Sequence, residues 1–201
     1  PTSADQEEFK TTLLKHLKAK QGALDLYLGV EAKRDTHTGT ITIHHHRKIT
    51  ELLQEQRMID SKPVSVPMDQ SVSLSRADCP PPGSELSQTT RKSYRSAVGS
   101  LMHIMTMTRP DIALPVKKLA GALDNPGEKH IHALKWLLRY LNGTRGYGIT
   151  YYGKNDPIRK DPHFDFTLHG YYDSDWGADI HDLKSIHWIC FLDGRGSYQL
   201  V

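Results

Sequence analysis

The first seventy residues alternate between hydrophobic and polar positions in patterns typical of two helices and a hairpin. Residues 5–20 repeat apolar side chains at helical spacing, and acidic residues occupy the first turn, where they complement the helix dipole. Residues 24–34 and 40–44 alternate as strands around a DTHTG turn, which predicts a β-hairpin over 24–44. Residues 45–58 predict a second helix whose apolar face is directed inward.

The middle of the chain has the pattern of a helical bundle that follows an irregular segment. Pro63 and Pro67 predict extended backbone, because proline restricts both itself and the residue before it. Residues 70–88 are rich in Ser and Pro, which predicts a linker or a long surface loop and the main domain boundary. Three helices are predicted beyond it, at 89–106, 110–123 and 127–142.

Two details of these helices can be tested directly. The periodicity of the first one places Tyr94, Leu101 and Met102 on the inward face. Pro115 falls inside the second one, where proline removes a backbone hydrogen bond at a cost near ~3 kcal/mol. We therefore expect a kink at Pro115.

The last third of the chain changes from helical periodicity to alternation. Residues 147–153, 165–177 and 185–194 predict three strands separated by turns. Strands that follow one another in this way suggest an antiparallel meander. The whole pattern predicts an α+β fold: a β-hairpin with helices, a three-helix bundle, and then an antiparallel sheet.

Composition excludes several classes of protein. The 201 residues suit one large domain or two small ones, and the 37% of hydrophobic residues is too high for a fully disordered chain. No apolar run approaches the length of a membrane span, and the first residues lack the apolar core of a secretory signal. Cys79 and Cys190 form no CxxC pair, and two isolated cysteines are typical of a reducing compartment. We therefore expect an intracellular location, cytoplasmic or nuclear. Because no membrane span is present in the sequence, we also expect no membrane partner.

Charge is distributed unevenly around the net value of +3. Residues 71–146 carry eleven Lys or Arg against five Asp or Glu, a net charge of +6, whereas residues 147–201 carry a net charge of −3. Such an asymmetry suggests a polyanionic partner. Helical spacing groups the basic residues into stripes that either follow a phosphate backbone or serve as a solubilising outer face. The candidate nucleic-acid-binding residues are Arg91, Lys92, Arg95, Lys117, Lys118, Lys135 and Arg139.

Acidic and histidine clusters offer weaker candidates for chemistry. Asp173 and Asp175 alternate on a predicted strand, so both carboxylates project from one face and could share a divalent cation such as Mg²⁺. A solvated strand end explains the same pattern. His44 and His46 could converge on a metal, but a surface position at the end of a strand explains them equally well. No Ser-His-Asp signature, GxSxG motif or phosphate loop is present.

Three blocks of this sequence resemble the polymerase region of copia-type retrotransposon polyproteins. They are KPVSVPMD, the ungapped block from YRSAVGSLMHIMTMTRPDIALPV to LKWLLRYLNGT, and GYYDSDWGAD. Upstream, DLYLGVEAKRDTHTGTITIHHHRKITELL is similar to the segment that follows the polymerase active site in that family. The resemblance covers roughly residues 9–194 and is most specific in the long middle block.

The resemblance implies a division of the chain. Residues 1–69 would be the end of a reverse transcriptase palm, 70–88 a linker, 89–146 a thumb-like helical region, and 147–201 a truncated ribonuclease H-like domain. The YLGVEA string resembles the element that grips the primer end, which implies that role for Tyr27, Leu28 and Gly29.

The same resemblance bears on catalysis. Asp173 matches the first metal-binding carboxylate of ribonuclease H, so Mg²⁺ is implied for the intact parent enzyme. The polymerase requires a Tyr-x-Asp-Asp turn, which this sequence lacks, and SIHWIC replaces the usual Ser-Thr-Ser-Gly turn after Lys184. We therefore expect an incomplete active site that binds no cofactor tightly.

Three hypotheses for function follow. The first is a reverse transcriptase and ribonuclease H segment that is inactive alone and binds RNA–DNA or DNA duplexes weakly and salt-sensitively, with the rest of the polyprotein as a further partner. The second is a metal-dependent nuclease that uses Asp173, Asp175 and Asp179. The third is a non-enzymatic module that binds another protein through exposed strand edges.

Overall fold

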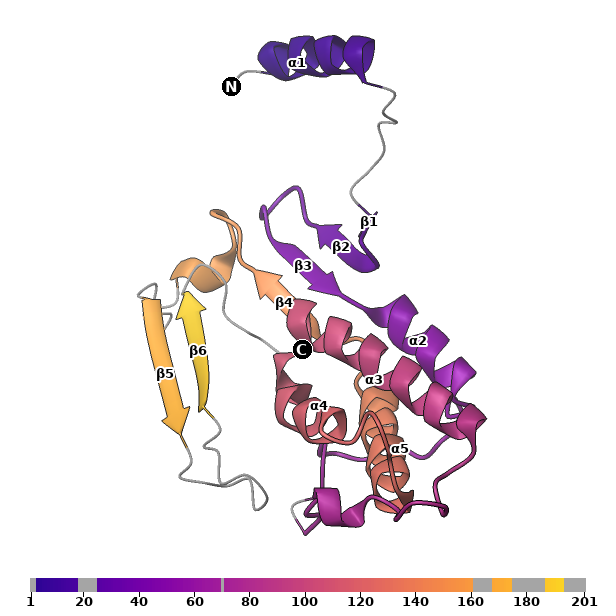
Figure 1. Ribbon diagram of the computed structural model, residues 1–201. Helices are drawn as coiled ribbons and strands as arrows, with labels where there is room; N and C mark the ends of the chain where they lie inside the picture. Colours follow the sequence, from indigo (N-terminus) through magenta and orange to yellow (C-terminus); the bar gives the residue numbers. More distant parts are fainter. Residues whose placement is uncertain (1–2, 18–24, 70, 161–167, 175–186, 194–201) are drawn as a thin grey trace.

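The computed structural model describes residues 3–17, 25–69, 71–160, 168–174 and 187–193. It confirms the predicted α+β class: an antiparallel sheet lies at one end of a group of packed helices (Figure 1). The helices are α1 (Ser3–His16), α2 (His46–Glu55), α3 (Gln88–Met107), α4 (Ala113–Ala120) and α5 (Glu128–Gly143), with short 3-10 turns η1 (Arg76–Asp78), η2 (Pro110–Ile112) and η3 (Pro157–Lys160). The strands are β1 (Leu26–Tyr27), β2 (Val30–Arg34), β3 (Ile41–His44), β4 (Gly148–Tyr151), β5 (Leu168–Ser174) and β6 (His187–Asp193).

The main sheet has four antiparallel strands in the order β1-β2-β3-β4. The predicted hairpin is confirmed for β2 and β3, whose turn is closed by the amides of His37 and Thr38 bonding to the Asp35 carboxylate. The predicted strand over 24–34 is wrong in one respect. A tight turn at Leu28 and Gly29 divides it into β1 and β2.

The predicted C-terminal meander is also wrong, because β4 pairs with β3 and joins the main sheet. Ile43 lies opposite Ile149, and the hydroxyls of Thr42 and Thr150 are 3.1 Å apart across the two strands. The other two predicted strands are confirmed as an antiparallel pair, β5 with β6, in a separate two-stranded sheet.

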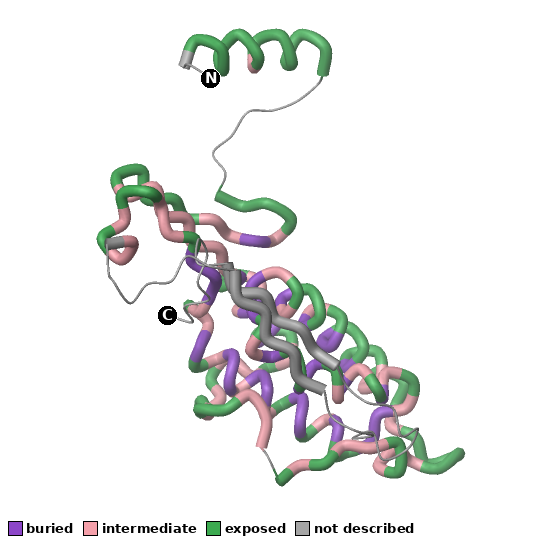
Figure 2. The backbone as a smooth tube through the Cα atoms, turned by 90° about the vertical axis from the view of Figure 1, so that its left-hand side faces the viewer, coloured by how far each residue is buried: buried purple, intermediate pink, exposed green. Residues whose placement is uncertain are grey.

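One hydrophobic core joins α2, α3, α4 and α5 (Figure 2). The inward positions of Tyr94 and Leu101 are confirmed, and both side chains are buried. The inward position of Met102 is wrong, since its side chain is 43% exposed. One residue advances a helix by about a quarter turn, so the neighbour of buried Leu101 faces outward and Ile104 is buried instead. The four-part domain division stays a prediction.

Pro115 produces no helix kink, contrary to prediction. The helix α4 begins at Ala113 after the short turn η2, so Pro115 is the third residue of a new helix. The first four backbone N–H groups of a helix have no intrahelical acceptor. The missing N–H of Pro115 therefore costs no hydrogen bond, and the buried ring contributes to the core instead.

The helix α1 is confirmed, but its side chains are exposed, apart from a half-buried Lys10 (Figure 2). Phe9 is 67% exposed and Leu17 is 55% exposed. Across the described ranges, no helix combines the length and apolar character that crossing a bilayer requires.

Candidate nucleic-acid interface

The helices α3 and α4 carry a purely basic set of charges. Their 28 residues contain Arg91, Lys92, Arg95, Lys117 and Lys118 but no Asp or Glu. The Ser87 side chain caps α3 by accepting a hydrogen bond from the Thr90 amide, and the first turn of the helix contains no carboxylate. We call these five residues the basic face.

The three basic residues near the start of α3 differ in their surroundings. Lys92 is exposed, and it forms no ion pair with any described residue. Arg95 is exposed but anchored, because its guanidinium donates hydrogen bonds to the carbonyl oxygens of Leu123 (2.7 Å) and Asp124 (3.1 Å). Arg91 is half-buried, and its Nε has no hydrogen-bond partner among the described residues.

The Arg95 contacts connect the start of α3 to the chain just beyond α4. Lys117 and Lys118 occupy the last turn of α4, where positive charge interacts favourably with the helix dipole. Lys117 is exposed and Lys118 is half-buried. The basic face therefore spans two packed helices.

Two of the predicted basic residues lie on a third helix, α5. Lys135 is exposed and lines a cavity of about 290 Å³ with Gln56 and Thr89. Arg139 is half-buried, stacks over the Trp136 ring at 5.4 Å and donates a hydrogen bond from Nε to the carbonyl oxygen of Lys62. The structure thus places five of the seven predicted residues on α3 and α4, which pack against one another, and the other two on α5.

The residues predicted to grip a primer form the β1–β2 turn. Tyr27 pairs with Val30, and Leu28 and Gly29 between them both have positive φ, 51° and 83°. Glycine adopts this conformation readily, but for leucine the left-handed region costs about 1–2 kcal/mol. Tyr27 and Leu28 are nevertheless 63% and 67% exposed, so burial of their side chains does not offset the strain.

A hydrogen bond from α3 reaches this strained turn. His103 Nε2 lies 3.1 Å from the carbonyl oxygen of Leu28, which can only accept, so the imidazole donates. A typical hydrogen bond contributes about 0.5–1.5 kcal/mol, which is comparable to the strain at Leu28. The sequence pattern did not indicate His103, because an exposed histidine on a helix carries no signal of its partner.

The ring of His103 packs against the ring of His45, which is buried. The His45 side chain is fully buried, its Nδ1 lies 2.6 Å from the Thr108 hydroxyl, and its ring meets that of His103 edge-on with centroids 5.1 Å apart. Burial, together with the nearby His103, lowers the pKa of His45 to about 4. The ring is therefore neutral at pH 7, and its Nε2 has no hydrogen-bond partner among the described residues.

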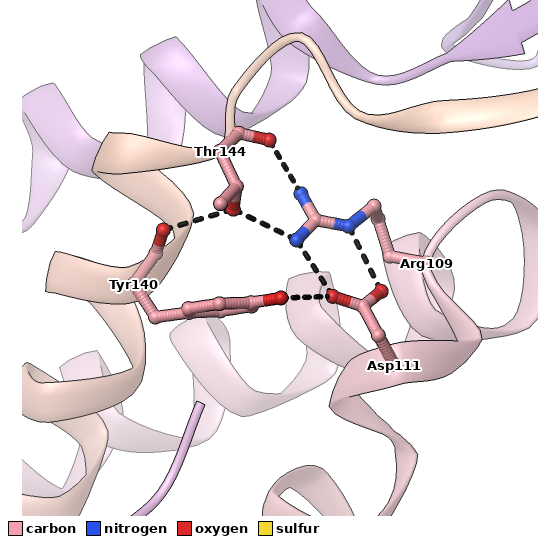
Figure 3. Close-up of polar contacts among 4 residues, drawn as sticks. All are labelled: Arg109, Asp111, Tyr140 and Thr144. Carbon is pink, nitrogen blue, oxygen red and sulfur yellow. Dashed lines mark hydrogen bonds and ion pairs between the residues drawn. The ribbon is translucent and has the colours of Figure 1, made fainter. Parts of the chain in front are cut away.

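A second missed feature is the polar cluster around Arg109, whose side chain is fully buried (Figure 3). The guanidinium donates two parallel hydrogen bonds to the Asp111 carboxylate, at 2.9 and 2.8 Å. It also donates to the carbonyl oxygen of Thr144 at 2.7 Å and to the Thr144 hydroxyl at 2.8 Å. The Tyr140 hydroxyl donates to Asp111, and burial next to that carboxylate raises the pKa of Tyr140 to about 12.

This cluster joins parts of the chain that are distant in sequence. Arg109 follows the C-cap residue of α3, whereas Thr144 follows α5 and is four residues before β4. Since β4 pairs with β3, the cluster fixes the main sheet, and with it the β1–β2 turn, against the end of α3. Arg109 is thus a structural cation that solvent does not reach.

The predicted metal and catalytic residues lie largely outside the described part of the chain. Asp173 lies on β5 opposite Trp188, and its side chain is not described. Asp175 and Asp179 are outside the described residues. His44 lies 3.5 Å from a Glu31 carboxylate oxygen, and within the described residues no three His, Cys, Asp or Glu side chains are arranged to hold a metal.

Comparison with known proteins identifies clear relatives. The chain is 37% identical over 180 residues to the retrovirus-related Pol polyprotein from transposon TNT 1-94 of Nicotiana tabacum, and 39% identical over 170 residues to that from transposon RE1 of Arabidopsis thaliana. The matches cover 89% and 84% of this chain but only 13% and 10% of the relatives. A third, the Pol polyprotein from transposon RE2 of Arabidopsis thaliana, is 35% identical over 170 residues. No protein-family model and no solved structure matches the chain.

Proposed function

From the homology of this chain to the Pol polyproteins of copia-type retrotransposons, we propose that its basic face and β1–β2 turn bind a nucleic-acid duplex within such a polyprotein. On this proposal, residues 1–69 are the end of a reverse transcriptase palm, 89–146 are the thumb-like region and 147–201 begin a ribonuclease H-like domain. The chain supplies duplex binding rather than a complete catalytic site, because it contains no Tyr-x-Asp-Asp turn.

The observation that carries the proposal is the basic face itself. Five cations lie on two packed helices that contain no carboxylate, and neither Lys92 nor Lys117 is paired with any residue described. Such cations can replace the counterions condensed on phosphates, which favours binding to nucleic acid irrespective of base sequence. An outer face that served only solubility would carry both signs of charge, as α2 does with Arg47 and Glu51.

Charge reversal tests the proposal directly. The full chain is titrated into a labelled RNA–DNA hybrid duplex in low salt, and fluorescence anisotropy gives the affinity. Lys92→Glu combined with Lys117→Glu should weaken binding by roughly tenfold or more, because each change replaces a phosphate contact with a repulsion.

A matched control distinguishes the effect of losing charge on the basic face from the effect of lowering the net charge of the chain. Lys154→Glu combined with Lys33→Glu makes the same change in net charge at two other exposed lysines. The control should weaken binding much less. Equal losses in the two double variants would contradict a localised interface.

One observation favours a second candidate function, a module that binds another protein. The exposed apolar side chains of α1 are typical of a surface that packs against a partner. A defined complex with another protein, formed without any affinity for duplexes, would favour this alternative. Duplex binding that the charge reversals weaken would favour the proposal above.

A further inference from the structure

The β1–β2 turn is held in place by a restraint from α3. A two-residue turn with positive φ at both positions usually contains Asn-Gly or Asp-Gly, because these residues tolerate the left-handed region. Here Leu28 takes the first position, with its side chain in solvent. The conformation therefore depends on main-chain contacts, and one of these is the His103 hydrogen bond to the Leu28 carbonyl oxygen.

The orientation of His103 is itself fixed. Its ring packs edge-on against that of His45, which is fully buried and lies within hydrogen-bond distance of the Thr108 hydroxyl. A chain of contacts thus runs from the end of α3 through two imidazole rings to Leu28. Rotation of His103 away from the turn would break the edge contact as well as the hydrogen bond.

The held turn exposes apolar side chains next to the C-terminal half of α3. Tyr27 and Leu28 project from the turn, and Met102, next to His103 on α3, is 43% exposed. The basic residues Lys92 and Arg95 lie two to three helical turns away along α3, on the solvent side. Apolar and aromatic side chains pack against sugars and bases, whereas lysine and arginine contact phosphates.

We infer that His103 is a positioning residue that holds the Tyr27–Leu28–Gly29 turn against α3, so that Tyr27 and Leu28 contact the sugars and bases of a duplex whose phosphates lie on the basic face. This inference rests on the function proposed above and deepens it. On this inference the basic face contacts the phosphates of the duplex, and the β1–β2 turn contacts its sugars and bases.

Two variants at position 103 distinguish the contribution of the hydrogen bond to Leu28 from that of the ring contact with His45. His103→Phe keeps the edge contact with His45 and removes the donor, whereas His103→Gln keeps a donor and removes the ring. The affinity of each full-length variant for the RNA–DNA hybrid duplex is measured over a range of salt concentrations. Amide hydrogen exchange of the peptide covering residues 25–31 is measured in the absence of nucleic acid.

The inference predicts a specific combination of results. His103→Phe should lower the affinity about three- to tenfold, the effect of one hydrogen bond, without changing its salt dependence, because no phosphate contact is lost. Exchange at residues 25–31 should become faster. His103→Gln keeps a donor but loses the ring contact with His45, so it should lose less affinity and less protection from exchange than His103→Phe. Lys92→Ala should reduce the salt slope by about one.

Other results would overturn the inference. Unaltered affinity and exchange in His103→Phe would mean that the hydrogen bond does not hold the turn. A smaller salt slope in that variant would mean that His103 contacts a phosphate itself. If the unaltered chain binds no duplex, the proposed function and the contact assigned to Tyr27 and Leu28 both fail, and the exchange result alone decides whether His103 holds the turn.

Discussion

Arg109 and Lys92 lie only 17 positions apart, yet the two regions around them use positive charge in opposite ways. Arg109 is fully buried, and its guanidinium makes four hydrogen bonds to Asp111 and Thr144. Lys92 is exposed and unpaired within the described residues. A buried cation is tolerated only with such partners, whereas an exposed one stays hydrated and free to meet an external anion. Burial therefore separates the structural cation Arg109 from Lys92, which we propose binds an external anion.

The two regions depend on each other. The Arg109 cluster joins the end of α3 to the segment that enters β4, and β4 belongs to the sheet that carries the β1–β2 turn. The buried cluster thus contributes to the position of the sheet and of the β1–β2 turn relative to α3. Loss of the cluster should affect folding, whereas loss of an exposed lysine should affect binding alone.

The largest expected effect comes from Arg109→Ala. Removing the guanidinium leaves the Asp111 carboxylate with one remaining partner, Tyr140, in a largely buried place, and breaking a buried ion pair costs about 3–5 kcal/mol. Urea denaturation should therefore show a loss of this size in the free energy of unfolding. Arg95→Ala is the control, and it should cost less than about 1 kcal/mol because Arg95 is exposed. Similar losses of unfolding free energy in Arg109→Ala and Arg95→Ala would contradict the distinction between the buried and the exposed arginine.

Lowering the pH tests the second buried group, His45. Its pKa in the folded chain is about 4, below the ordinary value of 6.5, so the folded state binds the proton less well than the unfolded state does. The stabilisation is fully present above pH 6.5 and is lost as the pH falls toward 4, by roughly 2–3 kcal/mol. The free energy of unfolding, measured by urea denaturation at several pH values, should fall over this window.

His45→Gln provides the control for the pH effect. The variant should flatten the decline between pH 6.5 and 4, although burial also lowers the pKa of His130, which leaves a residual slope. An unchanged slope in the variant would show that His45 ionises as easily in the folded chain as in the unfolded one.

Tyr140→Phe sharpens the comparison by removing a single hydrogen bond from the buried cluster. The Asp111 carboxylate then loses a donor at 2.8 Å while Arg109 remains in place. A hydrogen bond to a charged group contributes about 1.5–3 kcal/mol, and we expect a loss near the lower end of this range. Thermal and urea denaturation measure it, and a variant as stable as the unaltered chain would contradict the assigned role.

The smallest effect on stability is expected at the exposed lysines. Lys92→Ala and Lys117→Ala should each change the free energy of unfolding by no more than about 0.5 kcal/mol, because neither side chain has a described partner. The same variants should weaken duplex binding. A lysine variant that unfolds easily would show that the residue has a structural role.

Local patterns in the sequence predicted most of the helices, because apolar periodicity is set within a few turns. The pairing of β4 with β3 could not be predicted in the same way, since the strands are separated by more than 100 residues. Pro115 was misinterpreted because one unbroken helix was expected where η2 and α4 form instead.

In the candidate site too, the sequence pattern could not predict contacts between residues that are distant along the chain. Helical spacing identified the basic residues, but it could not show that Arg139 is held by the carbonyl oxygen of Lys62 or that Arg109 is buried. These outcomes depend on which distant segments fold against each side chain. The His45 contact with His103 is of the same kind, since its partners come from α3.

The most direct test of the central claim is the salt dependence of duplex affinity. The affinity of the full chain for an RNA–DNA hybrid duplex is measured from about 50 to 200 mM salt, and its logarithm is plotted against that of the salt concentration. Three to five phosphate contacts from the basic face predict a slope between about −3 and −5. A slope near zero, or no binding at the lowest salt, would contradict the account.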